Sequence, residues 1–187
     1  MPFESVPEVT DAKAMRALAH PVRIALLDAL TVHGQLTATE AAEIVGESPA
    51  NASFHLRQLA KYGYIEEAEA GAGRRRPWKR KALGMRFSEV HADPETAAAA
   101  RELSRVMTDR SLARVARGLE ENRAHPDEWR KVLGYDQMAL YLTPDELEQL
   151  AEAMHALMHR FGERRIRTDA TPAEAERVEI LTFAYRV

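Results

Sequence analysis

The stretch 37–81 constrains the fold of this chain more than any other segment, because start and stop signals for helices and strands follow one another there in a fixed order. The segment 37–40, Thr-Ala-Thr-Glu, fits a capping box, in which a threonine oxygen and a glutamate carboxylate satisfy the first backbone amides of a helix. Gly46 supplies the left-handed residue that ends such a helix. Ser48 followed by Pro49 is typical of the start of the next helix.

Two short helices joined by a tight turn are therefore predicted, which is a helix-turn-helix. The second helix is expected over 49–62, and Gly63 closes it. The inward positions of the first helix are Ala41, Ile44 and Val45, and those of the second are Ala52, Leu56 and Leu59.

Two helices are predicted upstream. Asp11 is a suitable cap for a helix that runs to about Leu18, and Pro21 starts another that runs to about Val32. The apolar side chains expected to face the core are Met15, Leu18, Ile24, Leu27 and Leu30.

A β-hairpin is predicted directly after the helix-turn-helix. Its strands are 64–67 and 78–83, joined by the Gly-Ala-Gly segment 71–73. Residues 74–86 carry seven basic side chains and no acidic one, on a chain whose net charge is −3. A helix-turn-helix followed by such a hairpin is a winged helix, and a local basic patch indicates a focused contact with a polyanion.

The outward face of the helix 49–62 carries side chains that suit base edges in a major groove. Asn51 and Gln58 match adenine, Arg57 matches guanine or phosphate, and Phe54 or Ala50 matches a thymine methyl group. Lys61 completes this face, while Ser48, Ser53 and His55 are expected to position the helix on phosphates. The alternative is a solvated helix face with no partner.

The hairpin carries the second candidate group. Its basic side chains are expected to follow the DNA backbone or to enter the minor groove, the alternative being a solvated charge run. These residues are Arg74, Arg75, Arg76, Lys79, Arg80 and Lys81. Trp78, which lies among them, is expected to anchor the base of the hairpin in the core.

The second half of the chain predicts a different unit. Segment 91–94 reads as a boundary, followed by one long helix, Glu95–Arg123, with an apolar stripe. A β-α-β unit is then expected from strand 137–142, helix Asp145–Phe161 and strand 178–187. The predicted fold class is α+β, mainly helical, with a winged helix-turn-helix domain over 1–90. A dimerisation and effector domain is predicted over 91–187.

Several function classes are disfavoured. The chain has no cysteine, which excludes disulfides, thiol catalysis and thiolate metal sites. No membrane span, signal peptide or catalytic constellation is recognisable, so we expect a cytoplasmic protein that is not an enzyme and uses no cofactor.

One stripe of helix Asp145–Phe161 resembles a metal site. It carries Glu148, Glu152, His155, His159 and Glu163, and the two histidines have the spacing of a helical zinc pair. No further ligand is fixed by the sequence, and the stripe lies opposite an apolar face. A solvated polar face is the favoured interpretation, so no metal site is predicted.

With these residues in view, the first half of the chain resembles the ArsR-type winged-helix repressors. The resemblance covers roughly residues 11–90. It rests on Leu-Ala-His-Pro-Val-Arg-Ile-Ala-Leu-Leu at 18–27, Ser-Phe-His-Leu-Arg-Gln-Leu at 53–59, and Gly-Tyr-Ile-Glu at 63–66. It implies a homodimer that binds an imperfect palindrome and represses transcription. Metal-sensing members commonly use cysteines near the helix-turn-helix, which this chain lacks, and the extension of roughly 100 residues exceeds the family plan.

The sequence thus predicts a homodimeric regulator that binds double-stranded DNA, with the first helix and the long helix Glu95–Arg123 at the dimer surface. A small-molecule effector stays open, because Met138, Leu140, Met154 and Leu157 suit either a pocket or an ordinary core. The alternative is a winged-helix module that binds protein or senses a ligand without sequence-specific DNA binding.

Overall fold

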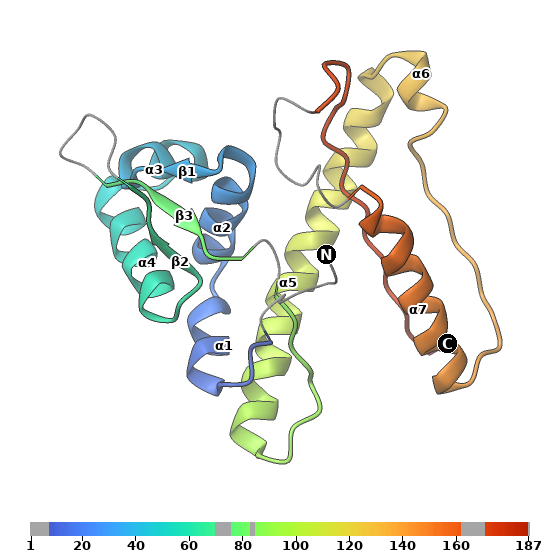
Figure 1. The fold of residues 1–187 in the computed structure, drawn as a ribbon, viewed down its shortest axis with the longest axis horizontal. Coiled ribbons are helices and arrows are strands. Elements are labelled where there is room, and N and C mark those ends of the chain that lie inside the picture. The colour runs from blue at the N-terminus through green and yellow to red at the C-terminus, as the bar shows by residue number, and fades with distance from the viewer. Residues whose placement is uncertain (1–7, 70–75, 83–84, 162–170, 187) are drawn as a thin grey trace. The chain divides into compact units, whose positions relative to one another are not determined.

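The computed structural model describes residues 8–69, 76–82, 85–161 and 171–186, with the side chain of His159 left out. The chain divides into two compact units, Met1–Leu112 and Ala113–Val187. The division falls within the long helix α5, Pro94–Glu121 (Figure 1). The predicted division into 1–90 and 91–187 stays a prediction.

The first unit begins with four helices, and each directly follows a residue whose side chain caps it. They are α1 (Ala12–Leu18), α2 (Pro21–His33), α3 (Ala38–Val45) and α4 (Pro49–Lys61). Asp11 accepts a hydrogen bond from the amide of Ala14 at 2.8 Å, and Ser48 accepts one from the amide of Asn51 at 3.2 Å. Thr37 forms the predicted capping box of α3. The helix starts predicted from the sequence are confirmed.

The turns that end α3 and α4 depend on glycine. Gly46 has φ 72° and ψ 33°, the left-handed conformation, and its amide donates to the carbonyl of Ala42. Gly63 has φ 77°. Other residues adopt this backbone conformation at a cost, so glycine at these positions lets α4 start and the chain turn into the hairpin.

A three-stranded antiparallel sheet follows the order β1-β3-β2. Its strands are β1 (Gln35–Leu36), β2 (Ile65–Glu67) and β3 (Trp78–Arg80). In the hairpin, Ile65 pairs with Arg80 and Glu67 with Trp78. The predicted hairpin is confirmed, whereas β1, only two residues long, was not predicted. The predicted connection 71–73 lies outside the described residues.

The hydrophobic core of the first unit is built by its helices and by β2. Its largest fully buried side chains are Met15, Leu18, Leu26, Leu30, Leu56, Leu59, Ile65 and Leu103. Trp78 is half-buried and packs against this core, as expected for an anchor of the hairpin. The winged helix-turn-helix and the mainly helical α+β class predicted from the sequence are therefore confirmed.

The predicted burial of one residue is wrong. Ile44 on α3 is 48% exposed, whereas Ala41 and Ala42 are fully buried. Since each residue turns a helix by about 100°, the inward face centred between Ala41 and Ala42 includes Val45 and leaves Ile44 to one side. The pattern of apolar residues alone did not distinguish a helix with Ile44 facing the core from one with Ile44 exposed.

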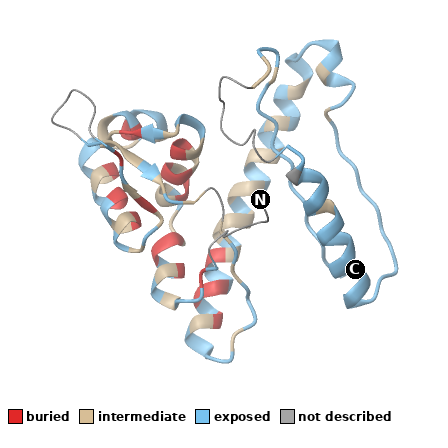
Figure 2. Cartoon of the chain, viewed as in Figure 1, coloured by how far each residue is buried: buried red, intermediate tan, exposed pale blue. Residues whose placement is uncertain are grey.

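The described part of the second unit differs from the first in having no buried core. It contains η1 (Asn122–Ala124), α6 (Asp127–Arg130) and α7 (Pro144–His159), and Thr143 and Glu146 form a capping box for α7. No described residue beyond Leu103 is buried, which Figure 2 shows as the absence of red from this part of the chain.

The predicted β-α-β unit is wrong for the described residues. The helix is present, but 137–142 and 178–186 form no strand. Their apolar side chains are exposed, including Met138 at 73% and Ile180 at 69%. A strand needs a hydrogen-bonded neighbour, and among the described residues neither segment makes backbone–backbone hydrogen bonds. A local pattern of side chains cannot supply that neighbour.

No described helix is both long and apolar enough to cross a membrane.

Candidate nucleic-acid interface

The outward face of α4 is an exposed stripe that ends in basic side chains. Ala50, Phe54, Arg57 and Lys61 are all exposed and follow one another at steps of four, three and four residues. That spacing places them on one side of the helix. Phe54, a large apolar side chain, is 50% exposed at the centre of the stripe. An exposed helix face with this composition suits insertion into a groove.

Two side chains of α4, one of them in the stripe, donate hydrogen bonds to the residue four positions earlier. The side-chain amide of Asn51 donates to Glu47 Oε2 at 2.7 Å, and Arg57 Nη1 donates to Ser53 Oγ at 2.8 Å. Asn51 and Gln58 are half-buried at the edges of the stripe. Glu47 is not among the interface residues predicted from the sequence. Its position four residues before Asn51 was the available signal for this pair.

His55 does not lie on the outward face. Its side chain is only 7% exposed, and its ring centroid lies 4.5 Å from that of His20 and 5.2 Å from that of Phe54. Position 55 shares the inward face of α4 with Ala52, Leu56 and Leu59, which explains its burial. The expected contact between His55 and phosphate is therefore dropped.

The environment of His20 and His55, whose rings are in tilted contact, favours the neutral form of both side chains. Burial lowers the pKa of His55, and the nearby His20 and Arg23 lower it further, while Glu47 opposes them. Burial and Arg23 likewise lower the pKa of His20. Nδ1 of His55 is buried and has no hydrogen-bond partner among the described residues. Contact between His20 and His55 thus joins the start of α2 to the inward face of α4, with both pKa values shifted toward the neutral form.

The described part of the hairpin presents its basic side chains on alternate sides. Lys79 is exposed and lies 3.4 Å from Glu66, and Arg76 is exposed and lies 3.0 Å from Glu67. Arg80 is turned the other way, as expected for successive residues of a strand. Arg74 and Arg75, predicted to contact DNA, lie outside the described residues. Lys81 is exposed.

Arg80 faces α2 instead of solvent. Its Nη1 donates to Thr31 Oγ1 at 2.8 Å. Burial lowers its pKa, and the carboxylate of Asp28 acts in the opposite direction. A DNA backbone cannot reach a guanidinium packed in this way without breaking the contact, so the expected contact between Arg80 and phosphate is dropped as well.

A shallow depression of about 450 Å³ lies beside the exposed stripe. It is formed by the first residues of α3 and of α4 and by the start of β3, and its lining residues are Thr37, Ala38, Thr39, Pro49, Ala50, Ser53, Arg76 and Trp78. Two helix N-termini and an arginine together favour negative charge. Ser53 and Arg76 thus stand where a phosphate beside the stripe would lie.

The candidate metal stripe on α7 has no support. Among the described residues, no group of three or more His, Cys, Asp or Glu side chains is close enough to hold a metal ion. The side chain of His159 lies outside the described residues, so the expected absence of metal binding stays a prediction.

Comparison with known proteins bears on the first unit. Residues 18–67, which include α2, α3, α4 and β2, match the model of a helix-turn-helix domain family. This chain contains a helix-turn-helix domain. The match supports DNA-binding transcription regulation as the class of function, and it does not distinguish the ArsR type from related winged types. A search of curated protein sequences finds no match.

Solved structures give only loose likenesses. One is a MarR family transcriptional regulator from Silicibacter pomeroyi DSS, with 16% sequence identity over 74% of this chain and 69% of that chain, at a TM-score of 0.32. Another is a mutant of ZitR from Lactococcus lactis in the apo form, with 17% identity over 76% of this chain and 83% of that chain, at a TM-score of 0.34. Nothing is concluded about this chain from TM-scores of 0.32 and 0.34.

Proposed function

We propose that this protein is a sequence-specific regulator of transcription, a repressor of the ArsR-like type, that binds double-stranded DNA as a homodimer. The observation that carries the proposal is the exposed stripe Ala50, Phe54, Arg57 and Lys61 on the second helix of a helix-turn-helix domain. In such a unit this helix enters the major groove while the preceding helix crosses the backbone.

Base reading is assigned to the stripe and its edges. Guanine O6 and N7 are assigned to Arg57 and adenine to Asn51, and each side chain would first have to exchange its present partner for the base. Phe54 supplies the apolar surface for a thymine methyl group. Gln58 is assigned to adenine, and Ala50 lies beside Phe54 on the same face.

Affinity is assigned to phosphate contacts. Ser53 and Arg76 line the depression beside α4, Ser48 caps the start of that helix, and Lys61 and Lys79 are further exposed cations. In the free protein Arg76 and Lys79 pair with exposed glutamates. Exposed ion pairs contribute about 0–1 kcal/mol, so a phosphate displaces them readily. Arg74 and Arg75 are proposed to act in the same way.

Dimerisation is assigned to α5 with α1. Leu112 and Leu119 on α5 are 52% and 40% exposed, and Val106, Met107 and Val115 are half-buried. A second copy that covers this stripe by a two-fold axis would present two reading helices to a pseudo-palindromic operator. The half-sites are then expected about 34–36 Å apart, or a multiple of that distance.

Sequence selection from random duplex DNA, at one stated salt concentration, tests the proposal. A palindromic consensus is the expected result. Salt-sensitive binding without any sequence preference would instead favour the alternative of a protein-binding or ligand-sensing module, for which the exposed apolar residues of the second unit are the specific observation.

A further inference from the structure

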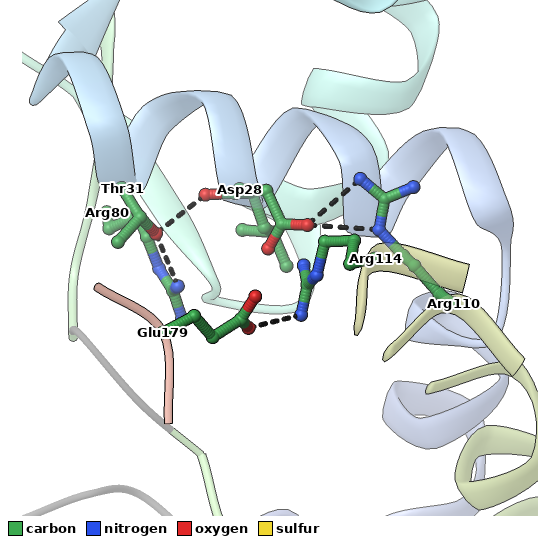
Figure 3. A network of polar contacts seen from close by, with 7 residues as sticks. Asp28, Thr31, Arg80, Arg110, Arg114 and Glu179 are labelled. Atoms are coloured by element: carbon green, nitrogen blue, oxygen red, sulfur yellow. Dashed lines mark hydrogen bonds and ion pairs between the residues drawn. The ribbon is translucent and has the colours of Figure 1, made fainter. Parts of the chain in front are cut away.

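We propose that Asp28 and Thr31 of α2 form a bracket that holds the wing strand β3 and the helix α5 in a fixed relation, with Arg80 as a positioning residue. The inference rests on the proposed function and deepens it. Figure 3 shows the side chains involved, with Arg80 and Arg110 each directed at this turn of α2. Asp28, Thr31, Arg80 and Arg110 all belong to the first unit.

The wing half of the bracket has one defined geometry. The hydroxyl group of Thr31 donates its hydrogen to the carbonyl of Leu27 at 2.8 Å. Its oxygen is therefore left to accept, and Arg80 Nη1 donates to it at 2.8 Å. Since a hydroxyl has a single hydrogen, the two bonds fit together only in these directions. Strand β3 is thus attached to α2 through a side chain 49 residues away in sequence.

The α5 half of the bracket is a two-pronged ion pair. Arg110 places Nε at 3.0 Å and Nη2 at 2.9 Å from the same oxygen, Oδ2 of Asp28. The two side chains are 31% and 37% exposed. Charge-assisted bonds of this kind are stronger than neutral ones, and partial burial reduces their screening by salt.

The two halves share the charge of Asp28. Burial lowers the pKa of Arg80, and the Asp28 carboxylate opposes this shift. Nε of Arg80 is buried and makes no hydrogen bond within the described part of the chain. One carboxylate therefore offsets two guanidinium groups, one from β3 and one from α5. Removal of the Asp28 carboxylate would leave the guanidinium groups of Arg80 and Arg110 partly buried on α2 without its negative charge.

The consequence for DNA binding follows from the alternation of β3. While Arg80 is held against α2, its neighbour Lys79 must point to the opposite side, where it is exposed. Helix α5 continues beyond Arg110 to Glu121. A displacement of α5 that breaks the pair with Asp28 would remove one of the two cations that share this carboxylate, and would so change the charge that Arg80 meets at α2. The bracket links the proposed dimer helix to the proposed phosphate contacts.

A double-mutant cycle tests the bracket without DNA. The variants are Arg80→Gln, Arg110→Gln and the double mutant, each measured by the unfolding equilibrium of the full chain. We expect a coupling of roughly two- to tenfold in the unfolding equilibrium constant, because both arginines act through Asp28. Arg101→Gln, exposed on the same helix, is the matched control for Arg110→Gln and should show no coupling with Arg80→Gln. Additive effects in the first cycle would overturn the bracket.

A second measurement addresses the wing. In Asp28→Asn and Thr31→Val, amide hydrogen exchange at Lys79 and Arg80 should quicken by roughly tenfold, while that of Ala52 on α4 stays unchanged. Unchanged exchange in β3 would overturn the positioning role.

On the selected DNA site, Arg80→Gln should weaken binding with an unchanged salt slope, whereas Lys79→Gln should lower the slope by about 1. An equal loss of slope in Arg80→Gln would make Arg80 a phosphate contact instead. The two proposals can fail separately. If the wild-type protein selects no DNA sequence but Arg80→Gln and Arg110→Gln are still coupled in the unfolding equilibrium, the proposed function is wrong and the bracket is supported.

Discussion

The two units of this chain start their helices in the same way and differ in what happens next. Thr37 and Thr143 form the same capping box with a glutamate three residues on. In the first unit the helix so started packs on a core, whereas in the described part of the second no residue is buried. A helix start is thus a local property of the sequence, and burial depends on what the rest of the fold brings to the helix.

The largest expected effect sharpens this comparison through the core. Leu56→Ala removes a fully buried side chain of α4, so we expect a loss of about 2–5 kcal/mol in the free energy of unfolding. Leu157→Ala on α7, where the side chain is 60% exposed, is the control. It should change stability by less than about 0.5 kcal/mol. Urea unfolding measures both, and equal losses would contradict the description of the second unit.

The wing provides the next test. Lys79→Ala and Arg76→Ala should each reduce the slope of log affinity against log salt concentration by about 1, because each removes one phosphate contact. Lys131→Ala, an exposed cation of the second unit, should leave the slope unchanged. Fluorescence anisotropy on one duplex across a salt series measures all three. A slope that falls equally in the control would indicate a general charge effect.

The shared capping box gives a smaller effect. Thr37→Ala and Thr143→Ala each remove a cap, which stabilises a helix by about 1 kcal/mol. We expect Thr37→Ala to lower the free energy of global unfolding by that amount. Thr143→Ala should reduce helix content by circular dichroism without shifting the main unfolding transition. A shift of that transition by Thr143→Ala would show that the second unit unfolds together with the first.

The smallest effect is expected from the neighbouring histidines His20 and His55. Their pKa values in the folded protein lie below the ordinary 6.5, so folding favours the neutral form. The stability this pair contributes is complete above pH 6.5 and is lost as the pH falls through the lowered values. Unfolding free energies from pH 7.5 down to pH 5 measure it, and His55→Leu should flatten the decline relative to the exposed control His125→Gln. A decline unchanged in His55→Leu would refute this account.

The sequence predicted most of the first unit because its signals act over a few residues. Asp11, Ser48 and the glycines at the ends of α3 and α4 fix where helices start and stop, and the structure agrees with each of them. The hairpin was predicted too, since its strands are close in sequence. The pairing of 137–142 or 178–186 with any neighbour was not predictable, because it depends on contacts distant in sequence.

The candidate interface was predicted in outline and misassigned in detail. Residue types and their order placed the stripe on α4 and the basic hairpin beside it. Which side chains are available to DNA depends on how each helix or strand is oriented. His55 faces the core and Arg80 faces α2. A shift of about 100° along a helix, or of one residue along a strand, separates a surface contact from a buried one. Composition alone does not resolve that difference.

The central claim is that the exposed face of α4 reads DNA bases, and the base preferences of Asn51→Ala test it most directly. Binding of wild-type and variant protein to every single-base change of the selected site, at one salt concentration, gives the preference at each position. We expect the variant to lose discrimination at one base pair in each half-site, by about 1–3 kcal/mol, and to keep it elsewhere. Unchanged preference at every position would contradict the claim.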